Sequence, residues 1–120
     1  LNELKILTPD LLVLAGFLWK IPNKIVKNFR NRIINIHPSL LPKYGGKGMY
    51  GINIHKAVIK NKEKQSGFTI HYVNEEYDKG GIIFQKIVDV DVKTPEELSE
   101  KILKLEHRYY PEIIKKILYE

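Results

Sequence analysis

Residues 11–16 read Leu-Leu-Val-Leu-Ala-Gly, a continuous apolar run that ends in glycine. An uninterrupted apolar segment of this length is typical of a strand buried on both faces of a parallel sheet. Residues 32–36, Arg-Ile-Ile-Asn-Ile, predict a second short strand. Fewer than twenty residues separate the two segments, and Pro22 opens a short helical pattern between them. We therefore expect a crossover connection between two parallel strands.

Downstream of these strands, loops alternate with periodic segments. Residues 38–51 contain two prolines and four glycines, which predicts a loop. The segments that follow are predicted as a helix over 52–62, a strand over 67–73, a loop over 74–81 and a strand over 82–88 that pairs with the one before it. Together with the first two strands, they predict an α/β fold with a mostly parallel or mixed open sheet and flanking helices.

The last helix is the best marked element. Thr94 precedes Pro95 and stands three residues before Glu97, which is the spacing of a capping box with proline at the first helical position. Apolar residues then recur at helical spacing as far as Pro111, where we expect the helix to break or restart. A chain of 120 residues is long enough for one compact domain, so residues 1–120 are assigned to a single domain.

Composition excludes several classes of protein. The chain has no cysteine, which rules out disulfide and thiolate chemistry, and no apolar run approaches the roughly 20 residues that span a bilayer. Residues 1–64 carry twelve Lys and Arg against three Asp and Glu, whereas residues 65–120 carry eight against eleven. The basic half favours anionic ligands such as phosphates, although a solvated lysine-rich surface explains most individual lysines.

Polar side chains at the end of the second strand suggest a reactive site. Asn35 and His37 are two residues apart and so face the same side of a strand, and Asp78 lies in a later loop. Ligands of open α/β sheets bind beyond the carboxyl ends of the strands. There, an amide and a protonated imidazole can both donate to a developing oxyanion, while a carboxylate favours the charged imidazole. The competing interpretation is a polar turn, with Asp78 as a turn residue.

Two further histidines are open to interpretation. His71 lies in the middle of a predicted strand, where it either supports the core or faces the same crevice. His55 lies on a predicted helix and is expected to be structural or exposed. A zinc site formed by His37, His55 and His71 is possible by count, but their spacing matches no metal-binding pattern, so no metal is expected.

Several motifs in order along the chain resemble the folate-dependent formyltransferases. They are NIHPSLLP over 35–42, LAGF over 14–17, GFTIHYV over 67–73, YDKGGIIFQ over 77–85 and LEHRYYP over 105–111. The combination of motifs most resembles the branch of this family that acts in purine synthesis. That resemblance implies a Rossmann-like fold and transfer of a formyl group from the cosubstrate 10-formyltetrahydrofolate to the amino group of glycinamide ribonucleotide.

The resemblance also implies roles for individual residues. Asn35 and His37 match positions that stabilise the oxyanion, Asp78 matches a carboxylate that orients the histidine and assists proton transfer, and Glu106 matches a position that contacts the nucleotide. The residues implied in folate binding are Leu18, Trp19, Lys20, Ile21, Val26, Ile33, Val73 and Asn74. The implied partners are small molecules rather than nucleic acid or membrane, with a cytoplasmic monomer or homodimer as the expected state.

The chain departs from the family pattern at its start. Family members begin with a strand and a glycine-rich loop that holds the substrate phosphate at a helix N-terminus, and no such segment precedes residue 11. We therefore expect a C-terminal portion of the domain, poorly active alone. Lys79 and the loop 44–51 also differ from the common pattern. The alternatives are a methionyl-tRNA or sugar-nucleotide formyltransferase, a formyltetrahydrofolate deformylase, or an inactive folate-binding fragment.

Overall fold

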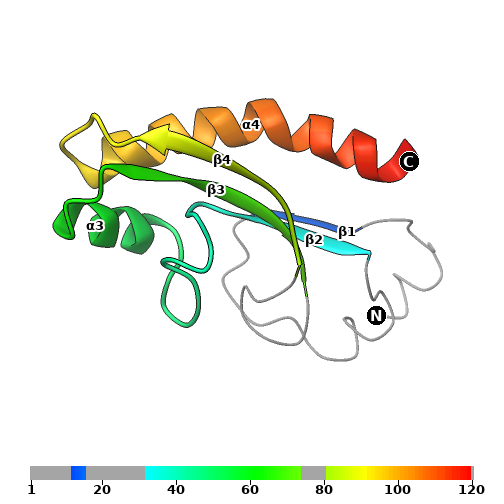
Figure 1. Cartoon of the computed structure of the whole chain (residues 1–120), viewed down its shortest axis with the longest axis horizontal. Coiled ribbons are helices and arrows are strands. Elements are labelled where there is room, and N and C mark those ends of the chain that lie inside the picture. Colours follow the sequence, from blue (N-terminus) through cyan, green and yellow to red (C-terminus); the bar gives the residue numbers. More distant parts are fainter. Residues whose placement is uncertain (1–11, 16–31, 74–80, 120) are drawn as a thin grey trace.

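The structure is a computed structural model that describes residues 12–15, 32–73 and 81–119. Its four strands form one sheet in the order β1-β2-β3-β4 (Figure 1). Strand β1 spans Leu12–Ala15 and pairs in parallel with β2, Ile33–His37. This pairing confirms the parallel strands expected from the two apolar runs. The helix predicted from Pro22 lies outside the described residues.

The other two strands make the sheet mixed. Strand β3 spans Gln65–Tyr72 and pairs antiparallel with β2, while β4, Ile82–Asp89, pairs antiparallel with β3. The predicted pairing of the last two strands is confirmed. Of the two sheet types that the pattern allowed, the mixed one is present, because within the described strands only β1 and β2 run in parallel.

Strand pairing gives the sheet an apolar face and a polar face. Ile36 lies opposite Ile70, and Ile70 lies opposite Phe84. Directly paired residues share a face, so these side chains form one apolar surface. On the other face, the registers place Asn35 opposite His71, His37 opposite Thr69, and Thr69 opposite Gln85. We call these five residues the polar face.

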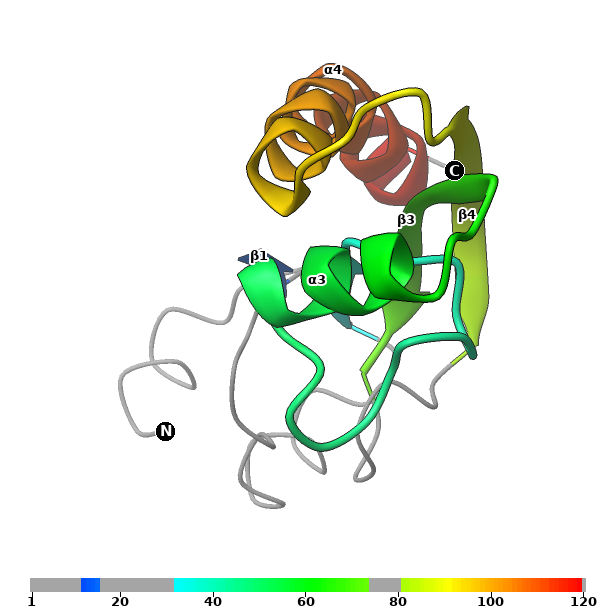
Figure 2. The same ribbon diagram turned by 90° about the vertical axis from the view of Figure 1, so that its left-hand side faces the viewer.

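The apolar face is covered by two helices. Helix α3 spans Ile52–Lys60 and α4 spans Pro95–Tyr119. Both lie on the same side of the β3–β4 pair, and they contact each other (Figure 2). Their buried side chains join the sheet in one core, which contains Ile34, Ile36, Ile54, Val58, Phe68, Ile70, Val88, Leu98, Ile102, Tyr110 and Ile113. Ile54 and Val58 therefore face inward on α3.

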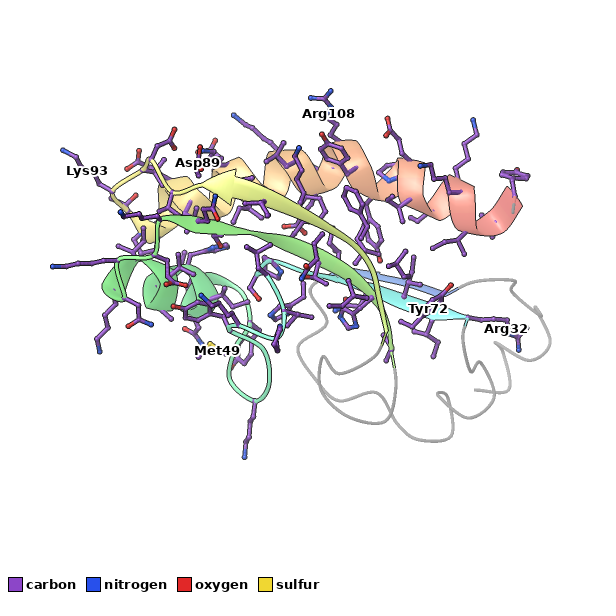
Figure 3. The ribbon with its side chains drawn as sticks, in the orientation of Figure 1. Arg32, Met49, Tyr72, Asp89, Lys93 and Arg108 are labelled. Carbon is purple, nitrogen blue, oxygen red and sulfur yellow. The ribbon has the colours of Figure 1, made fainter. Side chains whose placement is uncertain are left out.

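Helix α4 begins as the sequence predicts. The Thr94 hydroxyl accepts a hydrogen bond from the Glu97 N–H at 3.2 Å and donates to the Glu97 carboxylate at 3.0 Å. Arg108 on the helix and Lys93 before it project outward (Figure 3). No helix in the described part of the chain is long and apolar enough to cross a membrane.

The predicted break at Pro111 is wrong, because α4 continues through it. Proline removes one N–H donor and crowds the preceding turn, which normally kinks or ends a helix. Here Pro111 is on the exposed side, where water can hydrate the unpaired carbonyl, and its neighbours Tyr110 and Ile113 remain buried in the core. Packing of that buried face keeps the helix continuous.

Candidate active site

Asn35 and His37 lie in the C-terminal part of β2. Both residues are buried, with 4% of the surface of each exposed. Every residue of β2 is buried. The apolar neighbours Ile34 and Ile36 face the core, which turns Asn35 and His37 to the polar face. The predicted placement of both residues on one side, at the carboxyl end of a strand, is confirmed.

His71 lies across the strand pair from Asn35. The Asn35 side-chain nitrogen Nδ2 is 3.4 Å from His71 Nε2, a long hydrogen bond. His71 Nδ1 lies 3.0 Å from the Tyr72 carbonyl oxygen. A carbonyl can only accept, so Nδ1 carries the proton and Nε2 accepts from the Asn35 amide. His71 thus faces the same side as the donor pair and orients the Asn35 amide.

His37 is held from the loop that follows it. Its Nε2 lies 2.8 Å from the carbonyl oxygen of Tyr44. The chain turns sharply after the strand, where the Ser39 N–H donates to the His37 carbonyl at 2.8 Å. The imidazole is therefore fixed by the main chain of its own loop, a contact that the residue pattern alone did not indicate.

His55 is buried, contrary to the possibility that it is exposed. It is 3% exposed in α3, and its Nδ1 has no hydrogen-bond partner among the residues that the structure describes. Burial lowers the pKa of His55, and the nearby His37 lowers it further. The signal for this position was available in the helical pattern, because residue 55 lies beside Ile54 and one turn before Val58 on the inward side of the helix.

Only some of the other predicted site residues lie in the part of the chain that the structure describes. Ile33 is buried and Val73 is half-buried, and the Val73 N–H donates to the Ile33 carbonyl at 2.9 Å, so these two members of the predicted folate set lie side by side. The remaining members, Leu18, Trp19, Lys20, Ile21, Val26 and Asn74, lie outside the described residues, as does Asp78.

Glu106 lies on α4 as a half-buried carboxyl group. Burial raises its pKa to about 7. A carboxyl group with a pKa in this range exchanges its proton near neutral pH, which is unusual for a helix-surface glutamate. Across the described ranges, no three His, Asp or Glu side chains gather closely enough to hold a metal ion.

A surface cleft is lined in part by the loop that holds His37. Its volume is about 760 Å³, and its lining includes Leu40, Tyr44, Lys64 and Asp89. Neither Asn35 nor His37 lines it. The polar face is therefore the better candidate site, because it combines buried donors at a strand end in an α/β sheet, as expected for a group-transfer site that stabilises a charged oxygen.

The chain belongs to the formyl transferase family, whose pattern matches residues 1–114. It is 52% identical over 106 residues to the chloroplastic phosphoribosylglycinamide formyltransferase of Arabidopsis thaliana, covering 88% of this chain and 36% of that protein. It is 38% identical over 119 residues to the phosphoribosylglycinamide formyltransferase of Bacillus subtilis, covering 98% of this chain and 58% of that protein.

Solved structures agree with the sequence comparison. The crystal structure of phosphoribosylglycinamide formyltransferase from Bacillus halodurans superposes with a TM-score of 0.88 at 38% identity, covering 99% of this chain and 59% of that one. The chain thus spans between about one third and three fifths of the length of these relatives. The fold is that of the formyl transferases.

Proposed function

We propose that this chain carries the formyl-transfer site of a phosphoribosylglycinamide formyltransferase. The reaction moves the formyl group of 10-formyltetrahydrofolate to the amino group of glycinamide ribonucleotide. The observation that carries the proposal is the pair of buried donors, Asn35 and His37, on one face at the end of β2. Membership of the formyl transferase family and the names of the relatives support it.

The chemistry needs an oxyanion to be stabilised. The amine lone pair attacks the formyl carbon, and the carbonyl π electrons move to oxygen. The tetrahedral intermediate then reforms the carbonyl and breaks the bond to N10 of the folate, which takes the electron pair and, in net, the proton lost by the amine. Donors aimed at the developing oxyanion lower the barrier, and buried ones act more strongly than solvated ones.

Each residue has a part in this proposal. Asn35 Nδ2 and His37 donate to the oxyanion, and Asp78 orients His37 through its negative charge and assists the proton transfer. Glu106 contacts the nucleotide substrate, and its raised pKa makes that contact sensitive to pH. Ile33 and Val73 form part of the folate pocket, together with residues 18–21, Val26 and Asn74. A cytoplasmic monomer or homodimer remains our prediction for the working enzyme.

Matched substitutions in the complete gene product test the assignment. Asn35→Ala and His37→Ala are each expected to lower kcat by about 10²- to 10³-fold, the usual effect of removing one oxyanion donor. Asn53→Ala and His107→Ala are the controls, since both residues are exposed. Full turnover by both site variants would show that these residues do not carry the reaction.

The acceptor is tested separately. The enzyme is supplied with 10-formyltetrahydrofolate and either glycinamide ribonucleotide, initiator tRNA or no acceptor, and tetrahydrofolate release is followed. Turnover only with glycinamide ribonucleotide is the expected result. Formate release without an acceptor would indicate a deformylase, and folate binding without turnover would indicate a binding module.

A further inference from the structure

The contact between His37 and the Tyr44 carbonyl decides which ring nitrogen can act. Nε2 lies 2.8 Å from an oxygen that can only accept, so Nε2 must donate its proton. We infer that the Tyr44 carbonyl fixes His37 in its Nε2–H form, that Nδ1 is the ring atom that acts on the formyl oxygen, and that Thr69 is the positioning residue that holds this loop. The role of Nδ1 rests on the proposed function.

The backbone at Tyr44 is held in an unfavourable conformation. Its φ of 56° is left-handed, where the β-carbon of a non-glycine residue crowds the backbone. Such a conformation persists when the surroundings impose it. The Ser39 hydroxyl donates to the Lys43 carbonyl at 2.6 Å, and the Tyr44 hydroxyl accepts from Asn61 Nδ2 at 2.9 Å. The carbonyl that faces His37 is therefore positioned by a contact of the preceding peptide and by a contact of the Tyr44 side chain.

Thr69 fastens the start of the same loop to the sheet. Its hydroxyl donates to the Ser39 carbonyl at 2.7 Å and accepts from the Leu41 N–H at 3.0 Å. Gln85 Nε2 donates to the same hydroxyl at 3.0 Å and to the Leu41 carbonyl at 3.0 Å. One donor and two acceptor sites are all that a hydroxyl offers, so Thr69, which is fully buried, is saturated.

The fixed proton has a chemical consequence. With Nε2 committed, neutral His37 presents only a lone pair at Nδ1, and it can donate there only as the imidazolium. The titratable neighbours in the described structure are His55 on α3, His71 on β3 and the Lys43–Glu63 ion pair beside the loop. Burial lowers the pKa of His55, and the electrostatic effect of His37 lowers it further, so protonation of His55 beside His37 is disfavoured.

Nitrogen-15 NMR of the histidine-labelled complete protein tests the inference without any turnover. The expected spectrum of His37 shows a protonated Nε2 at every pH, with an Nε2–H proton protected from solvent exchange. The signal is assigned by its loss in His37→Ala. An unprotonated Nε2 in neutral His37 would overturn the inference while leaving the proposed function standing.

Three variants test the role of Thr69. Thr69→Val keeps the shape but removes the hydroxyl, and it is expected to abolish exchange protection of the His37 proton and to lower kcat by about 10- to 100-fold with little change in KM. Thr69→Ser is expected to restore both. Thr94→Val, at the exposed start of α4, is the matched control and should change neither.

Gln85→Met keeps the test decisive if Thr69→Val does not fold. It removes the two donors from β4 and is expected to weaken exchange protection of the same proton. If the His37 signal stays protected in both Thr69→Val and Gln85→Met, Thr69 does not hold the loop and that part of the inference is wrong.

Discussion

At Gly67 in β3, the neighbouring strand β4 leaves no room for a side chain. An added β-carbon at this position would overlap the carbonyl oxygen of Lys86 in β4 and press against the Leu40 side chain at 2.8 Å. The obstacle is backbone, which cannot rotate away as a flexible side chain can. The backbone φ of 157° also lies at the edge of the region that favours glycine. Gly67→Ala therefore forces the two strands apart.

The cost can be worked from these contacts. Overpacking a tight site costs about 1–3 kcal/mol. Separating the strands also weakens the neighbouring ladder hydrogen bonds, each contributing about 1 kcal/mol. We expect the free energy of unfolding to fall by about 3–5 kcal/mol, a large part of the roughly 5–15 kcal/mol available to a domain.

Chemical denaturation followed by circular dichroism measures this loss, with Gly81→Ala as the matched control. A β-carbon at Gly81 would meet no atom of the described residues within 4 Å, and the φ of Gly81 is not left-handed. That substitution is expected to be neutral or to stabilise by up to about 1 kcal/mol through the unfolded state. Equal unfolding free energies for the two variants would refute the reasoning from strand approach.

Three other substitutions test the helices. Thr94→Ala removes the cap of α4 and is expected to cost about 1 kcal/mol, whereas Thr94→Asn should retain most of the stability in the same denaturation assay. Ile102→Ala leaves a cavity at a fully buried core position and is expected to lower the free energy of unfolding by about 2–5 kcal/mol. Leu103→Ala is the control, because residue 103 is 48% exposed, and it should change the free energy of unfolding by less than about 1 kcal/mol. Burial raises the pKa of Glu106 in the folded state from 4.5 to about 7. Between these pH values the folded state keeps a proton on Glu106 that the unfolded state has lost, so the free energy of unfolding falls as the pH rises through this range. Glu106→Gln is expected to abolish this fall and to raise stability above pH 7 by up to about 3 kcal/mol, and an unchanged pH profile of the melting temperature would contradict it.

Local sequence patterns predicted the elements in which the local preference and the tertiary packing favour the same structure. The apolar run before Asn35 and the helical spacing of Ile54 and Val58 correspond to β2 and α3. The prediction at Pro111 failed because a local rule competed with burial on both sides of the proline, and packing of distant residues decided the outcome.

The candidate site was predictable only where its members lie in one strand. Asn35 and His37 share a face by the period of a strand, so their spacing sufficed. The contact of Asn35 with His71 depends on the register between β2 and β3, which a helix separates along the chain. The hold on His37 comes from a peptide carbonyl, which every residue type carries, so no residue pattern could indicate it.

The protons of His37 and His71 are placed by main-chain oxygens, at Tyr44 and Tyr72 respectively. A carbonyl is not altered when its side chain mutates. Evolution can therefore vary the side chain at residue 72 while His71 keeps its hydrogen on the same nitrogen, provided that the backbone keeps its path. At residue 44 the side chain has a part of its own, because its hydroxyl contact with Asn61 helps to position the carbonyl that faces His37.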